Sequence, residues 1–314
     1  MQRGLVIKST GSWYYVKEQS GTIVPCKMKG KYRLKGIRAT NPVAVGDRVI
    51  IQNKEPEDTC VIEKIEDRKN YIIRKSSKLS KQYQLIAANV DQALLMVSMI
   101  KPKTLTTFID RFLVTAEAYH IPAVLIFNKI DRYNEEDLDA LREFSGIYEK
   151  IGYPCFEVSA TEKTGLDIFA EVLKDKVSLL SGHSGVGKST LINAIDDQLD
   201  LKTKSISDSH RMGQHTTTFA EMHPLQIGGY IIDTPGIKGF GLSDFEKAEI
   251  AERFPEMRER MADCKFHNCM HVDEPQCAVK DAVELGDIAW SRYESYLKLY
   301  FGESDESYRK NIYE

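Results

Sequence analysis

Residues 182–190 have the residue types and the spacing of a phosphate-binding loop. They read Gly-His-Ser-Gly-Val-Gly-Lys-Ser-Thr and fit the pattern G-x-x-x-x-G-K-[ST]. Glycines let consecutive backbone N–H groups approach a phosphate, because a Cβ would obstruct the turn or the ligand. We expect Lys188 to neutralise the β- and γ-phosphates of a nucleotide and the Ser189 hydroxyl to coordinate Mg²⁺. The expected phosphate contacts are Gly182, His183, Ser184, Gly185, Val186, Gly187, Lys188, Ser189 and Thr190.

The chain on either side of this loop predicts the strand and the helix that the loop requires. An apolar run at 176–180 precedes the loop, and a helical pattern at 191–195 follows it. The phosphate would therefore lie at the positive N-terminal end of a helix. A glycine-rich turn with a chance lysine is the alternative, and the flanking elements argue against it.

A second motif, Asn128-Lys-Ile-Asp131, follows a predicted strand and suits the recognition of guanine. Asp131 can accept hydrogen bonds from N1–H and the 2-amino group, Asn128 can bond N7, and the Lys129 stem can lie over the ring. Adenine lacks both donors and would leave the carboxylate without partners. Ser159-Ala160, at the end of another predicted strand, could offer a backbone N–H to the guanine O6. The expected base contacts are Asn128, Lys129, Ile130, Asp131, Ser159 and Ala160.

The elements that must position these motifs alternate between apolar runs and helical patterns, which predicts a parallel sheet covered by helices. Strands are expected at 90–100, 122–128 and 154–159, and helices at 104–120, 134–152 and 165–174. A later strand runs into Asp233-Thr-Pro-Gly236, where Asp233 would hold Mg²⁺ through water and the Gly236 N–H would sense the γ-phosphate. One threonine of 216–218 would close over the metal, and we assign Thr217 to that role.

The first 75 residues predict a small β-barrel. Five short β-rich segments, at 5–7, 13–16, 22–26, 47–51 and 60–65, suit an OB-fold. Residues 1–81 hold 18 Lys+Arg against 8 Asp+Glu, and the remaining residues hold 25 against 38, so the net charge of −3 conceals a basic N-terminal region. The basic stretch 27–38 with Tyr32 interleaved favours contact with RNA, the alternative being a solvated hairpin. The polar segment 74–81 is expected to be a linker.

Three cysteines and one histidine near the C-terminal end have the composition of a metal site. Cys264-x₄-Cys269-x-His271-x₅-Cys277 offers three thiolates and an imidazole, the set that closes a tetrahedral structural zinc site. His267 is the competing imidazole, and unligated thiols are the alternative. The other three cysteines are scattered, so we expect no disulfide framework and a cytoplasmic, reducing location. No apolar run reaches the length of a membrane span.

In this order the motifs resemble translational GTPase-like P-loop proteins whose elements are circularly permuted. The guanine-reading segments come first, the phosphate loop follows, and the Asp-x-x-Gly turn comes last. Such a permutation preserves the site, because strand ends lie at the surface and can be reconnected. With the OB-like barrel before it and the Cys/His cluster after it, the chain closely resembles the ribosome small subunit-dependent GTPase A family over nearly its whole length. The zinc ligands of that family match the four residues of the cluster.

The sequence indicates less directly which residue orients the water that attacks the γ-phosphate. Many GTPases orient the attacking water with a glutamine directly after the Asp-x-x-Gly turn, and this chain has Ile237 there. An aliphatic side chain cannot do so, and either another group acts or hydrolysis is slow until a partner binds. His215 adjoins the switch threonines and could orient water, with Gln214 a weaker candidate and an exposed loop histidine the alternative. The resembled family has a histidine in the same place, which implies that His215 is catalytic.

The resemblance implies a GTPase of three domains. These are an OB-fold barrel at 1–75, a circularly permuted α/β P-loop domain at 76–240 and a mostly α-helical zinc-binding domain at 241–314. It also implies a late-stage small-subunit assembly factor whose GTP hydrolysis the small ribosomal subunit stimulates. The expected partners are that subunit, its rRNA, GTP and GDP, without DNA or membrane, and the chain is expected to be a monomer. A nucleotide-gated RNA-binding scaffold with little turnover and an ATP-using P-loop enzyme are the alternatives.

Overall fold

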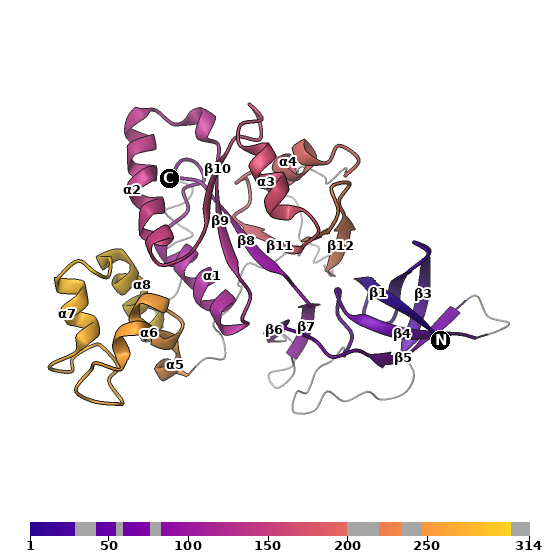
Figure 1. Ribbon diagram of the computed structural model, residues 1–314, viewed down its shortest axis with the longest axis horizontal. Helices are drawn as coiled ribbons and strands as arrows, with labels where there is room; N and C mark the ends of the chain where they lie inside the picture. Colours follow the sequence, from indigo (N-terminus) through magenta and orange to yellow (C-terminus); the bar gives the residue numbers. More distant parts are fainter. Residues whose placement is uncertain (29–41, 55–58, 76–82, 200–219, 234–245, 303–314) are drawn as a thin grey trace, which may run out of the picture. The chain divides into compact units, whose positions relative to one another are not determined.

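The computed structural model describes residues 1–28, 42–54, 59–75, 83–199, 220–233 and 246–302 (Figure 1). The chain forms two compact units, each built from several stretches of sequence. The first unit holds Met1–Leu94, Asp167–Ser181 and Ile192–Lys238. The second unit holds Leu95–Leu166, Gly182–Leu191 and Gly239–Glu314.

The first unit begins with a closed five-stranded barrel, as the sequence predicts. Its strands are β1 (Gln2–Ser9), β2 (Tyr14–Glu18), β3 (Ile23–Met28), β4 (Arg48–Lys54) and β5 (Thr59–Ile65). They are ordered β1-β2-β3-β5-β4, and β4 pairs back to β1 to close the barrel. Only the β3–β5 pair is parallel. Alternate residues such as Val6, Val16 and Ile51 fill the interior, which is why the short strands read as apolar at every second position.

Three further strands also belong to the first unit. They are β11 (Val177–Gly182), β12 (Glu221–Pro224) and β13 (Tyr230–Asp233). β13 runs parallel to β11, and β12 runs antiparallel to β13. β12 also pairs with barrel strand β1 at Glu221 and Lys8, whose side chains form an ion pair of 3.0 Å. The sequence did not predict β12, which is only four residues long.

A hairpin occupies part of the segment that the sequence assigned to a linker. β6 (Tyr71–Lys75) pairs antiparallel with β7 (Tyr83–Ala88), so Arg74 and Lys75 belong to a strand. The polar composition of 74–81 concealed this pairing, because the buried residues of the hairpin, such as Ile72 and Leu85, lie outside that segment. Residues 76–82 lie outside the described part of the chain.

The second unit contains the other strands of the α/β domain and its larger helices. Its strands are β8 (Gln92–Val97, which begins in the first unit), β9 (Ala123–Asn128) and β10 (Cys155–Val158), in the order β10-β9-β8. Its helices are α1 (Thr106–Ala118), α2 (Glu135–Lys150) and the short η1 (Ile130–Arg132). Helix α4 (Lys188–Ile195) begins in the second unit and ends in the first, and α3 (Leu166–Leu173) belongs to the first unit except for Leu166. Every residue of β8 and β9 is buried, which explains their continuous apolar sequence.

Helix α2 shows how local sequence fixes an element beside the site. The Asn134 side chain accepts the Asp137 N–H at 2.8 Å, and the Asp137 carboxylate accepts the Asn134 N–H at 3.2 Å. This capping box satisfies two otherwise free backbone donors. Acidic residues in the first turn and Lys150 in the last turn also stabilise α2, because their charges interact favourably with the helix dipole. Helix α2 begins at Glu135, four residues after Asp131, the last residue of the guanine-reading segment.

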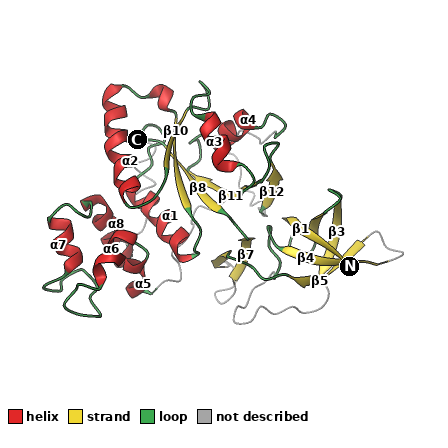
Figure 2. Ribbon diagram, in the orientation of Figure 1, coloured by secondary structure: helices red, strands yellow, loops and turns green. Residues whose placement is uncertain are grey.

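The C-terminal part of the second unit is helical (Figure 2). It contains α5 (Lys247–Glu252), α6 (Pro255–Met261), α7 (Ala278–Glu284) and α8 (Trp290–Phe301), in agreement with the mostly α-helical composition expected of this region. Phe254, Met257 and Tyr296 lie in its core, and Val114 of α1 joins the same cluster. Buried Arg292 of α8 pairs with Asp110 of α1 at 2.5 Å and with Glu256 at 2.7 Å. The ion pairs and the shared core therefore fix α8 against α1.

The predicted fold class is confirmed: an N-terminal OB-type barrel, an α/β domain and a C-terminal helical region with a Cys/His cluster. The domain boundaries at 75/76 and 240/241 stay predictions. No helix in the described stretches is both long and apolar enough to cross a membrane.

Candidate nucleotide site and metal centre

The predicted phosphate loop connects β11 to α4. Gly187 has a φ of 106°, and a Cβ there would lie 2.4 Å from Asn128 Nδ2. Gly182 has a φ of 141°, and a Cβ there would lie 2.8 Å from the Met96 carbonyl oxygen. Glycine is therefore required at both positions by conformation and by space. The loop closes tightly over the ends of β8 and β9.

The side chains of the loop hold its shape. Lys188 Nζ donates to the carbonyls of Gly182 at 2.6 Å and His183 at 2.8 Å, so its ammonium group lies against the loop. The His183 ring lies 3.9 Å from the ring of Phe108 on α1, measured between centroids. Ser189 and Thr190 lie in the first turn of α4, the end of a helix at which backbone N–H groups can bind an anion.

The guanine-reading segment lies directly beside this loop. Asn128, the last residue of β9, is 2 % exposed, and its Nδ2 donates to the Val186 carbonyl at 2.9 Å. Its Oδ1 accepts the Ala160 N–H at 3.4 Å. Lys129 has a left-handed φ of 71°, and its Nζ donates to the Gly185 carbonyl at 2.8 Å. The structure thus brings three motifs together that are separated in sequence.

The Asp131 carboxylate is exposed and held by a second motif residue. Ser159 Oγ donates to Asp131 Oδ1 at 2.5 Å and accepts the Glu162 N–H at 3.0 Å. The predicted role for Ser159 was a backbone contact, and this use of its side chain was missed. Desolvation and the neighbouring Arg132 lower the pKa of Lys129. The fixed Asp131 carboxylate suits the hydrogen-bonding edge of a guanine, and the aliphatic stem of Lys129 suits its face.

The remaining predicted nucleotide contacts belong to other parts of the chain. Asp233 ends β13, with its backbone in register with Leu180 of β11, two residues before the phosphate loop begins. His215, Thr217 and Gly236 lie outside the described residues. The catalytic and switch assignments therefore stay predictions.

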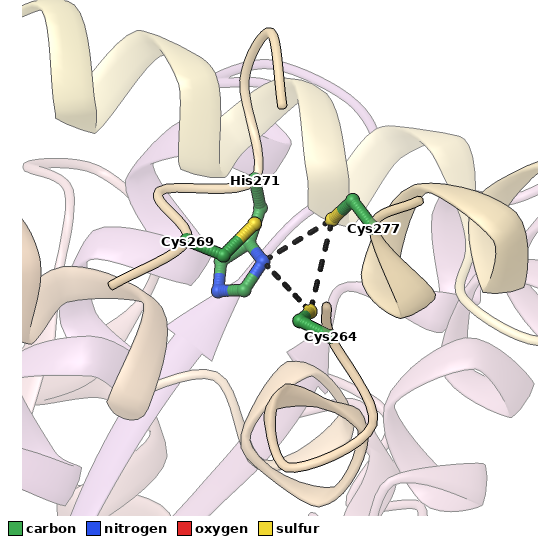
Figure 3. A group of neighbouring side chains, drawn as sticks. All are labelled: Cys264, Cys269, His271 and Cys277. Carbon is green, nitrogen blue, oxygen red and sulfur yellow. Dashed lines mark hydrogen bonds between the residues drawn. The ribbon is translucent and has the colours of Figure 1, made fainter. Parts of the chain in front are cut away.

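The second candidate site is the cluster of Cys264, Cys269, His271 and Cys277 (Figure 3). The potential ligand atoms all lie within 4.8 Å of one another. His271 Nδ1 points between two sulfurs, at 3.6 Å from Cys264 Sγ and 3.3 Å from Cys277 Sγ, and those sulfurs are 4.0 Å apart. A tetrahedral ion with metal–sulfur bonds of about 2.3 Å needs sulfur–sulfur edges of about 3.8 Å. The cluster therefore fits a tetrahedral ion.

Hydrogen bonds around the cluster hold the loop that carries its residues. Glu274 accepts the N–H groups of Met270 at 2.8 Å and Val272 at 3.0 Å, and Tyr293 donates to the His271 carbonyl at 2.7 Å. Burial raises the pKa of the Cys269 thiol to about 12 and lowers the pKa of His271. The Cys269 thiol is therefore neutral in the absence of a cation, and binding of a metal ion there would release its proton. The spacing of the cysteines did not reveal the part played by Glu274.

Comparison with known proteins agrees with this geometry. A sequence profile of the RsgA GTPase matches residues 65–243, and a profile of the RsgA N-terminal domain matches residues 3–61. The chain belongs to the RsgA GTPase family. A small ribosomal subunit biogenesis GTPase RsgA of Christiangramia forsetii is 55 % identical over 314 residues, covering 99 % of both chains. An RsgA of Phocaeicola vulgatus is 57 % identical over 98 % of this chain and 99 % of its own.

Two solved structures share the fold. YjeQ from Thermotoga maritima matches with a TM-score of 0.79 and 37 % identity over 96 % of this chain and 98 % of its own. YloQ, described as a circularly permuted GTPase, matches with a TM-score of 0.74 and 29 % identity over 96 % and 94 % of the two chains. The predicted family, the permuted fold and GTPase activity are therefore confirmed.

Proposed function

We propose that this RsgA GTPase acts in the biogenesis of the small ribosomal subunit, binding its rRNA and hydrolysing GTP when it contacts the subunit. The relatives that match over nearly their whole length carry this biogenesis role in their names. The observation that carries the proposal is the meeting of Asn128, Lys129 and Ser159-Ala160 at the phosphate loop, since this constellation suits guanine and not adenine.

In this proposal the phosphates bind to residues 182–190 and the base to residues 128–131 with Ser159 and Ala160. Mg²⁺ would be held by Ser189, Thr217 and Asp233, and the Gly236 N–H would contact the γ-phosphate. Mg²⁺ supplies charge compensation between the β- and γ-phosphates when it is bound. Within the described residues, the helix start at Lys188 and the carbonyl-bound Lys188 ammonium are consistent with this arrangement.

Hydrolysis is assigned to His215, because Ile237 cannot orient water. An imidazole beside the switch threonines can orient the attacking water or stabilise developing charge. The small subunit would act by ordering this segment around the nucleotide.

The other two parts of the chain have separate roles in the proposal. The four-residue Cys/His cluster would bind one structural Zn²⁺ and leave no open position for catalysis. The barrel would contact rRNA, and its exposed Lys27 ammonium, 4.3 Å from the Trp13 ring, is an example of the cation and aromatic surface that suits phosphates and bases. The protein would work as a monomer in the cytoplasm, where Cys26, Cys60 and Cys155, which lie outside the cluster, stay reduced.

Substitution Asp131→Asn tests guanine reading. An amide at this position can pair with the 2-keto group of xanthine, while it places an N–H against the guanine amino group. We expect the GTP affinity to fall by about 100-fold or more and xanthosine triphosphate to become the better ligand. Equilibrium titration with both nucleotides, and with ATP as a control, measures this. A variant that keeps its preference for GTP would contradict the assignment of the base site.

A further inference from the structure

Tyr133 lies two residues beyond Asp131, outside any motif that predicts nucleotide binding. It directly follows η1 and is 9 % exposed, so its ring is buried within the second unit. A buried tyrosine hydroxyl needs hydrogen-bond partners. The partners of this hydroxyl show what the residue holds in place.

The Tyr133 hydroxyl connects the chain beyond β8 to the end of β9. It accepts the Met99 N–H at 2.7 Å and donates to the Asn128 carbonyl at 3.2 Å. A hydroxyl has one donor and two acceptor positions, so both bonds form at once. Burial raises the pKa of Tyr133, which keeps the proton on the oxygen at neutral pH. The single side chain therefore fixes two backbone groups.

The orientation of the Asn128 carbonyl affects the position of the residues that would contact the base. Its peptide leads into Lys129, whose left-handed conformation turns the chain sharply away from β9. The Asn128 side chain meanwhile contacts Val186 of the phosphate loop and Ala160. Rotation of this peptide would move both the Asn128 amide and the following Asp131. Fixing the carbonyl therefore fixes the groups that face the base.

The other partner of the hydroxyl, the Met99 N–H, belongs to the loop of residues 98–104, which is held by its own hydrogen bonds. Within this loop the Ser98 N–H donates to Thr104 Oγ1 at 3.1 Å, and the Thr104 N–H donates to the Ser98 carbonyl at 2.8 Å. Lys129 Nζ also donates to the Lys101 carbonyl at 3.0 Å. The guanine-reading segment is thus tied to the loop at two points, through Tyr133 and through Lys129.

From this geometry we propose that Tyr133 is a positioning residue for guanine recognition, acting through the Asn128 peptide. The inference rests on the proposed base site and adds a residue to it. Substitution Tyr133→Phe keeps the ring and removes the hydroxyl, leaving the Met99 N–H and the Asn128 carbonyl without that partner. GDP and GTP should bind about tenfold more weakly, and the preference for GDP over inosine diphosphate should narrow. The turnover rate at saturating GTP should stay within about twofold.

The experiment compares Tyr133→Phe with Tyr148→Phe in the full chain. Tyr148 is also buried, and its hydroxyl donates to Asp110 at 3.0 Å, away from the base site. The Kd values for GDP, inosine diphosphate and ADP are measured for each protein, together with the free energy of unfolding. The ratio of Kd values for GDP and inosine diphosphate does not depend on the folded fraction, so it remains informative if a variant is destabilised.

A narrower ratio in Tyr133→Phe, with the ratio of Tyr148→Phe unchanged, supports the proposal. An unchanged affinity and ratio in Tyr133→Phe would overturn it, and so would an equal change in both variants. A wild-type chain that binds ADP as tightly as GDP would instead refute the base site itself, whatever the variants do.

Discussion

At the scale of single residues, the site depends on close approaches that allow no extra atom. Gly187 and Asn128 come from segments almost sixty positions apart, yet the glycine leaves room for the Asn128 amide to reach the Val186 carbonyl at 2.9 Å. The glycine pattern predicted a loop that approaches phosphate. The structure adds that the same glycine lets the base-reading segment contact the phosphate loop.

Substitution Gly187→Ala should therefore impair nucleotide binding strongly. The Cβ would meet Asn128 Nδ2 at 2.4 Å and force an alanine to a φ of 106°. The strained backbone alone costs about 1–2 kcal/mol, and displacement of Asn128 adds to it, so we expect the GDP affinity to fall by about tenfold or more. Fluorescence titration with a labelled GDP measures the change.

Gly152→Ala is the matched control for this prediction. Gly152 has a similar φ of 97°, and a Cβ there would meet no atom within 4 Å. Its variant should lose stability from the strained backbone while its GDP affinity stays the same. If Gly187→Ala binds GDP as wild type does, the close approach of the two segments is not needed for binding.

At the scale of elements, the Cys/His cluster joins the loop after α6 to the start of α7. Cys277 immediately precedes α7, while Cys264, Cys269 and His271 lie in the loop before it. This part of the chain is stabilised by one aromatic and apolar core, which also includes Val114 of α1. A metal ion bound by the cluster would stabilise both this loop and the short helix α7, because a short helix is only marginally stable alone.

Removing the metal should loosen this region and leave the base site intact. We expect one zinc per chain by elemental analysis, and a strong chelator at neutral pH should lower the melting temperature of the protein. Hydrogen exchange should increase over residues 262–284, because the loop there loses its ligands. Cys277→Ser should have the same effect, with Cys155→Ser as the control outside the cluster. Protein that carries no metal yet is equally stable with and without the chelator would contradict a structural ion.

The sequence allowed the long elements and the motifs to be predicted because both are local. The period of apolar residues in α1 and α2 and the buried runs of β8 and β9 each lie within one stretch of chain. β12 and the β6–β7 hairpin were missed because short strands are defined by partners distant in sequence, such as the pairing of Glu221 with Lys8. Tyr133 was missed for the same reason, since both bonds of its hydroxyl are visible only when the chain is folded.

At the scale of the whole molecule, the order of the segments along the chain places the GTPase motifs between the barrel and the helical region. The barrel comes first, the base-reading segments and then the phosphate loop follow, and the helical region comes last. In the first unit, β1 of the barrel pairs with β12, which lies in the chain between the predicted switch threonines at 216–218 and the Asp-x-x-Gly turn at 233–236. An rRNA contact on the barrel thus has a backbone connection to the part of the chain that follows the switch threonines.

The proposed function requires that contact with the small ribosomal subunit stimulates GTP hydrolysis at this site. The decisive measurement is the GTP turnover rate of the wild-type chain and of His215→Ala, each with and without purified small subunits. We expect subunits to raise the wild-type rate on the order of tenfold or more and His215→Ala to lose most of this stimulation. A wild-type rate that is the same with and without subunits would show that the subunit does not activate this GTPase.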